Sequence, residues 1–321
     1  QLYTYISFIL CINLKVIFYS NRSNIKMQHT IFHKKLKFNK LIILDCVPDG
    51  DMQTARRLHE NLSDIGFRTG IALLKIKDII TLREVLQQIK ESFQPELNIG
   101  MQPIIHIEAH GNPQSMELPD GSYFSWDELA NNLRIINQFM CNQLITFIGT
   151  CHGYNFIYVN HTITKFTPVY FCIAPLDSIP AGDLQDSTFA FYQSLFTTGD
   201  LTLSASLLDD SKFYTYNSDY MFHRAFHEAM QRDHRGKILR ERKEALISEA
   251  INELGDVWNG MSESDRSAFL KKARKFLDDK LKRKDSLKNE FDRFSICYMG
   301  YSNDEVFEEI WNHMQSDKQV K

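Results

Sequence analysis

Several features that would assign a sequence to a familiar class are missing from these 321 residues. The six cysteines form no Cys-x-x-Cys pair and follow no regular spacing, which argues against a zinc site of thiolates and favours reduced thiols in a cytosolic compartment. A net charge of -3 gives no general attraction to nucleic acid or acidic membranes. The sequence has no internal repeat and no low-complexity stretch. What remains is an ordinary globular composition, long enough for one large domain or two modest ones.

The first 19 residues lack the flanks of a signal peptide, although they are apolar enough to suggest a signal or membrane segment. No basic segment precedes them, no small-residue cleavage site follows, and Asn13 and Lys15 interrupt the run. β-branched and aromatic residues are frequent, which favours strands. We therefore expect residues 1–39 to form an N-terminal extension of strands, with a membrane role as the alternative.

From residue 40 to 217 the sequence alternates between apolar runs and segments with helical spacing. The apolar runs predict strands at 41–46, 67–76, 103–109, 144–149 and 168–174. The helical spacing predicts helices at 54–65, 79–93, 125–140 and 184–196, the third opened by a capping box of Ser125 and Glu128. Largely apolar strands separated by helices predict an α/β fold with a mostly parallel sheet, covered by helices on both faces.

Residues 218–321 have a different character and predict a helical C-terminal region. The expected helices are 218–234, 237–254, 262–282, 287–298 and 304–314. A basic cluster includes Lys271, Lys272, Arg274 and Lys275. Acids such as Asp278 are interleaved with it, so a solvated helix face is favoured over a nucleic-acid patch. The region is interpreted as a regulatory or docking element, or as extra packing around the core.

Two apolar runs end in a reactive side chain followed closely by glycine. They are IIHIEAHG, ending at His110-Gly111, and LITFIGTCHG, ending at Cys151-His152-Gly153. The carboxyl ends of parallel strands meet at one edge of a sheet, so we expect His110 and Cys151 to be neighbours. A base beside a thiol suits nucleophilic catalysis, and the backbone N–H groups of Gly111 and Cys151 could form an oxyanion hole.

On these motifs the chain resembles the caspase-like (clan CD) cysteine peptidases, most closely their bacterial CHAT-type branch, which is related to separase. That family places His-Gly after one strand, and a small residue, Cys and often Gly after the next. The segments 41–57 and 174–195 also resemble it, whereas Thr150, where Ala or Gly is usual, and His152 depart from the pattern. The resemblance covers roughly residues 40–215.

The resemblance implies a caspase-like three-layer sandwich in which Cys151 is the nucleophile and His110 the general base and acid, with no cofactor. It also implies a regulated cytoplasmic effector of a bacterial antiviral or cell-death system, held inactive until a protein partner or a signal releases it. The expected partners are a protein substrate and an activating or inhibitory protein. Direct nucleic-acid binding is not expected.

The distribution of charge predicts which peptide bond is cut. Between Ile135 and His223 there is no arginine, only two lysines and seven aspartates, and the turn after the first strand adds Asp49 and Asp51. A pocket for an aspartate side chain needs an arginine fork, whereas an acidic pocket selects a basic partner. We therefore predict cleavage after Arg or Lys. Asp177 and Asp183 are the candidates for the acidic floor of the pocket, with ordinary loop and N-cap roles as the alternative.

Two other functions stay open at this point. His106, Glu108 and His110 alternate on one predicted strand and share a face, and His152 could join them as metal ligands. This spacing is not the helical His-Glu-x-x-His of zinc peptidases, so a metal-dependent hydrolase is the less favoured alternative and no metal is expected. The other alternative is a catalytically silent caspase-like interaction module. The simplest interpretation of the two residues is that Cys151 is a core cysteine and His110 a satisfied polar residue. The presence of both Cys151 and His110 argues against a silent module.

Overall fold

The computed structural model describes residues 38–67, 70–93, 100–158, 162–233, 236–281 and 283–319. The strands expected in the N-terminal extension lie outside these residues, except for its last two positions. The described chain divides into two compact units. The first comprises residues 38–158 and 166–221, and the second residues 162–165 and 222–319. The division falls within a helix, a few residues after the boundary expected at residue 217.

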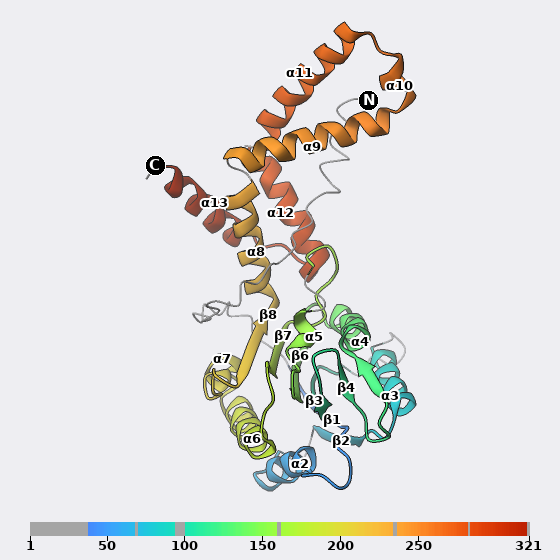
Figure 1. Cartoon of the computed structure of the whole chain (residues 1–321). Helices are drawn as coiled ribbons and strands as arrows, with labels where there is room; N and C mark the ends of the chain where they lie inside the picture. Colours follow the sequence, from blue (N-terminus) through green and yellow to red (C-terminus); the bar gives the residue numbers. More distant parts are fainter. Residues whose placement is uncertain are drawn as a thin grey trace. The chain divides into compact units, whose positions relative to one another are not determined.

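The first unit is built on a mostly parallel sheet with the strand order β2-β1-β3-β6-β7-β8 (Figure 1). These strands are β1 (Lys40–Asp45), β2 (Ile71–Lys75), β3 (Pro103–Gly111), β6 (Ile145–Thr150), β7 (Phe171–Pro175) and β8 (Phe213–Asn217). Only β8 runs antiparallel within this order. A short antiparallel hairpin, β4 (Ser115–Glu117) and β5 (Tyr123–Ser125), extends from the end of β3.

Helices cover both faces of this sheet. One face packs against α2 (Thr54–Asp64), α6 (Ala181–Thr198) and α7 (Leu201–Ala205), and the other against α3 (Ile79–Glu91), α4 (Trp126–Phe139) and α5 (Asn155–Tyr158). Alternate residues of a strand reach opposite layers: Ile104 lies in the α2/α6 layer and Ile105 in the α3/α4 layer. The predicted fold class is confirmed as a three-layer α/β sandwich, consistent with a caspase-like core.

The expected strands and helices are present, with shifted ends. The strand expected at 67–76 is only Ile71–Lys75, and the helix expected at 184–196 begins earlier, at Ala181. Ser125 caps α4 by accepting the N–H of Glu128 at 3.2 Å, as predicted. The Glu128 carboxylate does not complete the capping box, because it pairs instead with Arg83 of α3 at 2.7 Å. The sequence did not predict β4, β5 or β8.

The second unit is helical, as expected. Its helices are the greater part of α8 (Ser218–Asp233), then α9 (Gly236–Leu254), α10 (Asp256–Gly260), α11 (Glu263–Lys280), α12 (Lys284–Met299) and α13 (Asp304–Gln319). Buried side chains such as Leu246, Ala250, Phe269 and Ala273 join α9 to α11. None of the described helices combines the length and apolarity that crossing a membrane requires.

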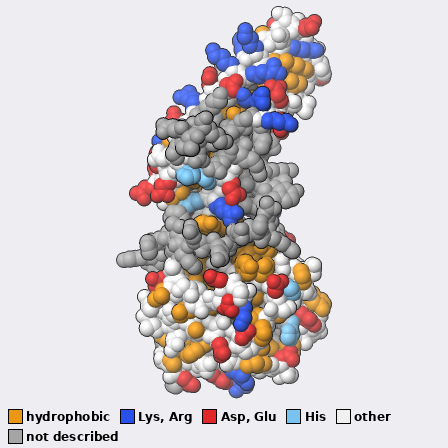
Figure 2. Space-filling view, turned by 60° about the vertical axis from the view of Figure 1, so that its left-hand side comes forward, with side chains coloured by type: hydrophobic (Ala, Val, Ile, Leu, Met, Phe, Trp, Pro, Cys, Tyr) orange, Lys and Arg blue, Asp and Glu red, His pale blue; other side chains and the backbone are white. Residues whose placement is uncertain are grey.

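The basic cluster of α11 is exposed and mixed with acids. Lys271, Lys272 and Lys275 are exposed, and Arg274 makes a two-point contact with Glu244 of α9 at 2.8 and 2.9 Å. Figure 2 shows acidic side chains among the lysines and arginines of the face in view. This mixture supports the interpretation of a solvated helix face.

Two buried cysteines are predicted to be chemically inert in the folded protein. Cys46 and Cys172 are fully buried, and burial raises the pKa of Cys46 and raises that of Cys172 to about 12. Both thiols therefore stay protonated and shielded at pH 8. We expect iodoacetamide to leave them unmodified in the native protein and to alkylate both in urea, as measured by peptide mass spectrometry. The exposed Cys141 and Cys297 are the reactive controls. Native-state labelling of Cys172 as fast as that of Cys141 would contradict the structure.

Candidate active site

The structure places His110 and Cys151 at the same edge of the sheet. The pairing of β3 with β6 ends at Ala109 and Thr150, so these two residues come next on neighbouring parallel strands. The backbones touch there, since a Cβ added to Gly111 would overlap the carbonyl oxygen of Cys151. The ring of His110 is 55% exposed and Cys151 is partly exposed, so solvent reaches both.

The alternation of side chains assigns both residues to the same layer. His106, Glu108 and His110 follow one another on the α2/α6 side of β3, where His106 lies against Tyr192 of α6. On β6, Phe147 faces the same layer, and Cys151 is four residues further on. The two reactive side chains therefore leave neighbouring strands on the same face.

Cys151 lies in a tight turn that glycine makes possible. The N–H of Gly153 donates to the carbonyl of Thr150 at 2.9 Å, which puts Cys151 and His152 at the centre of the turn. A Cβ on Gly153 would come within 2.9 Å of Thr150 O, so a larger residue would force the turn open. His152 adopts a φ of 59°, a left-handed conformation that costs a non-glycine residue on the order of 1 kcal/mol.

Contacts with the segment after β7 compensate for the strain at His152. Its N–H donates to Asp177 O at 3.2 Å, and its ring Nδ1 lies 3.3 Å from Leu176 O. The same segment reaches the sulfur, because the N–H of Ile179 donates to Cys151 Sγ at 3.5 Å. The sulfur also lies 3.9 Å from Ile179 O, so both backbone polar groups of Ile179 contact it. Within the described chain, no hydrogen bond joins Sγ to the His110 ring.

The structure reveals a carboxylate beside His110 to which the sequence analysis gave no role in catalysis. Asp51 lies on the loop between β1 and α2, and its Oδ2 is 2.7 Å from His110 Nε2. A carboxylate can only accept, so Nε2 carries a proton, and in the neutral ring the lone pair is therefore on Nδ1. One sequence signal could have found this residue: Asp51 follows β1, which pairs with β3, so the rule that joined His110 to Cys151 also applies to Asp51.

Below His110 lies a fully buried polar network. His106 Nε2 is 2.8 Å from Glu108 Oε1, the hydroxyl of Thr54 donates to the other carboxylate oxygen, and His106 Nδ1 is 3.1 Å from the Tyr192 hydroxyl. Burial and the nearby charge of Glu108 raise the pKa of Tyr192, so its hydroxyl stays a donor.

This network accounts for two of the four side chains considered as metal ligands. His106 and Glu108 satisfy each other, and the His152 ring turns to Leu176 O. The described residues contain no group of three or more His, Cys, Asp or Glu arranged to hold a metal ion.

The two candidate specificity residues have different surroundings. Asp177 is exposed, and its carbonyl holds the turn of Cys151 through the N–H of His152. Asp183 lies in the first turn of α6, and its Oδ2 is 2.8 Å from Lys212 Nζ. Both members of this pair are 40% exposed, so the contact contributes little to stability. It still places a cation on the carboxylate, which makes Asp177 the better acidic candidate.

The backbone geometry offers one clear donor for an oxyanion. The N–H of Asn112 donates to Ser115 O at 2.9 Å in the hairpin of β3 and β4, where Gly111 is opposite Met116. Hydrogen bonding alternates along an antiparallel pair, so the N–H of Gly111 turns away from β4, toward the side of Cys151. The other predicted donor, the N–H of Cys151, belongs to the residue directly after Thr150, the last residue of β6 that pairs with β3.

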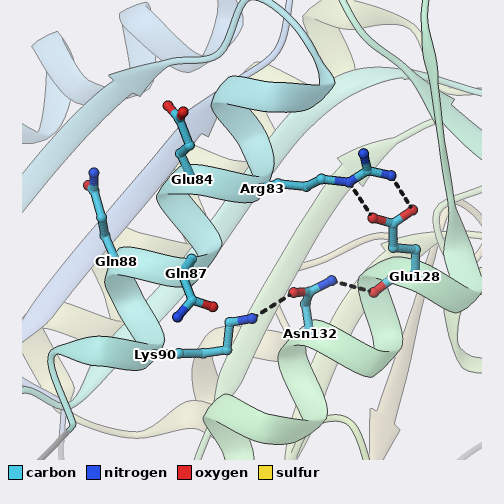
Figure 3. A pocket seen from close by; sticks show the side chains of 7 residues that line it. All are labelled: Arg83, Glu84, Gln87, Gln88, Lys90, Glu128 and Asn132. Carbon is cyan, nitrogen blue, oxygen red and sulfur yellow. Dashed lines mark hydrogen bonds and ion pairs between the residues drawn. The ribbon is translucent and has the colours of Figure 1, made fainter.

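A hollow of about 530 Å³ lies elsewhere, between α3 and α4 (Figure 3). Four of its side chains pair with one another: Arg83 pairs with Glu128 at two points, and Lys90 donates to Asn132 at 3.0 Å. It is lined by neither His110 nor Cys151, so it is separate from the candidate active site.

No protein-family model matches the chain, and no curated protein has a significantly similar sequence.

Replacing Gly111 with alanine tests the contact between the two strand ends. The new methyl would overlap Cys151 O and Thr150 Cγ2, so one strand end must shift. We expect Gly111→Ala to lower the free energy of unfolding by roughly 1–3 kcal/mol, measured by urea denaturation. Gly182→Ala is the control, because a Cβ there meets nothing within 4 Å on α6. Equal stabilities of the two variants would contradict the close approach.

Proposed function

We propose that the chain is a cysteine endopeptidase with Cys151 as nucleophile and His110 as general base and acid. The observation that carries the proposal is that a partly exposed thiol and an imidazole with its lone pair on Nδ1 leave the ends of adjacent parallel strands on the same face. The fixed turn around Cys151 and the buried surroundings of Cys46 and Cys172 support the choice of this thiol.

The reaction uses these groups in sequence. Nδ1 of His110 takes the proton of Cys151, and the thiolate attacks the peptide carbonyl to form a C–S bond. The negative charge on the carbonyl oxygen is stabilised by the N–H of Gly111, with that of Cys151 as the second donor. His110 then protonates the leaving amine as the C–N bond breaks. Water, deprotonated by His110, hydrolyses the thioester and restores the thiol. Asp51 fixes the tautomer of the neutral imidazole and stabilises the imidazolium that forms from it.

We further propose cleavage after Arg or Lys, with Asp177 as the main acidic group of the pocket. Asp177 is exposed on the segment that contacts both His152 and Cys151, and no arginine lies between Ile135 and His223. The expected role, a cytoplasmic effector in bacterial defence or cell death controlled by a protein partner, rests on the family resemblance alone. The helical second unit is the candidate regulatory element.

Substitution of the three site residues tests the proposal against a silent interaction module. We expect Cys151→Ala and His110→Ala to lower peptidase kcat/KM by at least ~100-fold. Asp51→Asn is expected to lower it on the order of 10-fold, because an amide cannot stabilise the imidazolium. Asp49→Asn is the matched control, since Asp49 lies on the same loop but pairs with Lys75. Fluorogenic peptides measure each rate. Full activity of the Cys151→Ala protein would refute the nucleophile, and an inactive wild type would favour the silent module.

Substrate preference is tested on peptides that differ only at the residue before the cut. We expect Arg and Lys peptides to be cleaved well above Asp or Leu peptides. Asp177→Asn is expected to lower kcat/KM for the Arg peptide about 10-fold and to leave that for the Leu peptide nearly unchanged, because only the charged side chain loses its partner. Asp183→Asn is the comparison. It should lower kcat/KM for the Arg peptide less, because the Asp183 carboxylate is already paired with Lys212. A wild-type preference for Asp or Leu would refute the acidic pocket.

A further inference from the structure

A single residue of β3, Glu108, holds both ends of the loop that carries Asp51. Its main-chain oxygen accepts the N–H of Cys46 at 2.8 Å, where the chain leaves β1. Its carboxylate accepts the hydroxyl proton of Thr54, the first residue of α2. Both ends of the loop are therefore hydrogen-bonded to Glu108, which lies two positions before His110 on β3.

Internal contacts stiffen this loop between its two ends. The side-chain amide of Gln53 donates to the carbonyls of Pro48 and Asp51 at 2.7 and 3.1 Å. Lys75 Nζ donates to Val47 O at 2.6 Å. Because these contacts make the loop rigid, a displacement of Thr54 also displaces Asp51.

The surroundings of Glu108 are shaped to keep a carboxylate in the core. It is fully buried, a costly position for a charge unless each carboxylate oxygen finds a donor. His106 supplies the second donor at 2.8 Å, and the start of α2 adds the favourable end of a helix dipole. The neighbouring strand makes room, since a Cβ on Gly149 would lie 3.1 Å from Glu108 Cγ. A hydrophobic residue could fill this space but could not bond to Thr54.

We propose that Glu108 is a positioning residue of the reaction centre: it clamps the loop of Asp51 to the strand of His110, and so fixes the distance between carboxylate and imidazole. The role rests on the proposed function where the reaction is concerned. Its geometric part, the state of the His110 ring, is measurable without any substrate.

Thr54→Val tests the clamp, because it removes the hydroxyl while keeping the shape of the side chain. The full chain is labelled with ¹⁵N, and the His110 ring signals are assigned with His110→Gln. We expect Thr54→Val to lower the fraction of the ring protonated on Nε2, and to lower kcat for the Arg peptide about 10-fold with KM unchanged. Thr54→Ser restores the hydroxyl and should return both values toward the wild type. Glu108→Gln is expected to change the His110 ring and kcat in the same direction as Thr54→Val. If Glu108→Gln does not fold, Thr54→Val still tests the clamp.

The matched control is Thr188→Val, the same substitution at another fully buried threonine of the α2/α6 side. Among the described residues, the Thr188 hydroxyl donates only to Gln185 O. It should leave the His110 ring and kcat as in the wild type. An unchanged His110 ring in Thr54→Val, or an equal change in Thr188→Val, overturns the clamp. A ring that responds to Thr54→Val alone, in a protein that cleaves no peptide, supports the clamp and refutes the proposed function. Activity that needs Cys151 but ignores Thr54→Val supports the function and overturns the clamp.

Discussion

The register between β3 and β6 is the constraint on which the candidate active site depends. Because side chains alternate along a strand, a slip of one residue would turn His110 or Cys151 to the opposite layer. The register is set by burial, since Ile104 and Ile145 must reach one layer and Ile105 the other. Core packing therefore decides the chemistry at the edge of the sheet, and the two reactive residues need no direct bond to be held as neighbours.

The polar contacts around this edge refine what the register establishes. Asp51 selects the tautomer of His110, while the segment after β7 holds the turn of Cys151 through His152 and approaches the sulfur through Ile179. The first group comes from the loop between β1 and α2 and the second from the loop between β7 and α6. The proposed base and nucleophile are thus positioned by separate loops on a common sheet.

The sequence predicted the features that depend on local pattern. The apolar runs of β1, β3 and β6 identify the central strands, and the rule for parallel sheets then joins His110 to Cys151. The half-formed capping box of α4 shows the limit of such patterns, because a long-range contact with Arg83 takes the Glu128 side chain. The antiparallel β8 was missed although its sequence, FYTYN, is rich in the aromatic and β-branched residues that are typical of strands.

The contact between Asp51 and His110 was missed for a different reason. The two residues are 59 positions apart, and a loop aspartate is commonly a turn residue, so its partner is decided only when β1 and β3 pair. The alternation of His106, Glu108 and His110 left a metal site open as the less favoured alternative, whereas the structure pairs Glu108 with Thr54 and His106.

A crystal structure of the protein after reaction with a peptidyl arginyl chloromethylketone tests the central claim most directly. The account predicts one thioether on Cys151 Sγ, with the ketone oxygen within hydrogen-bonding distance of the Gly111 N–H and His110 Nδ1 facing the sulfur. An adduct on Cys141 or Cys297, or a ketone oxygen that turns away from Gly111 with His110 out of reach, would contradict it.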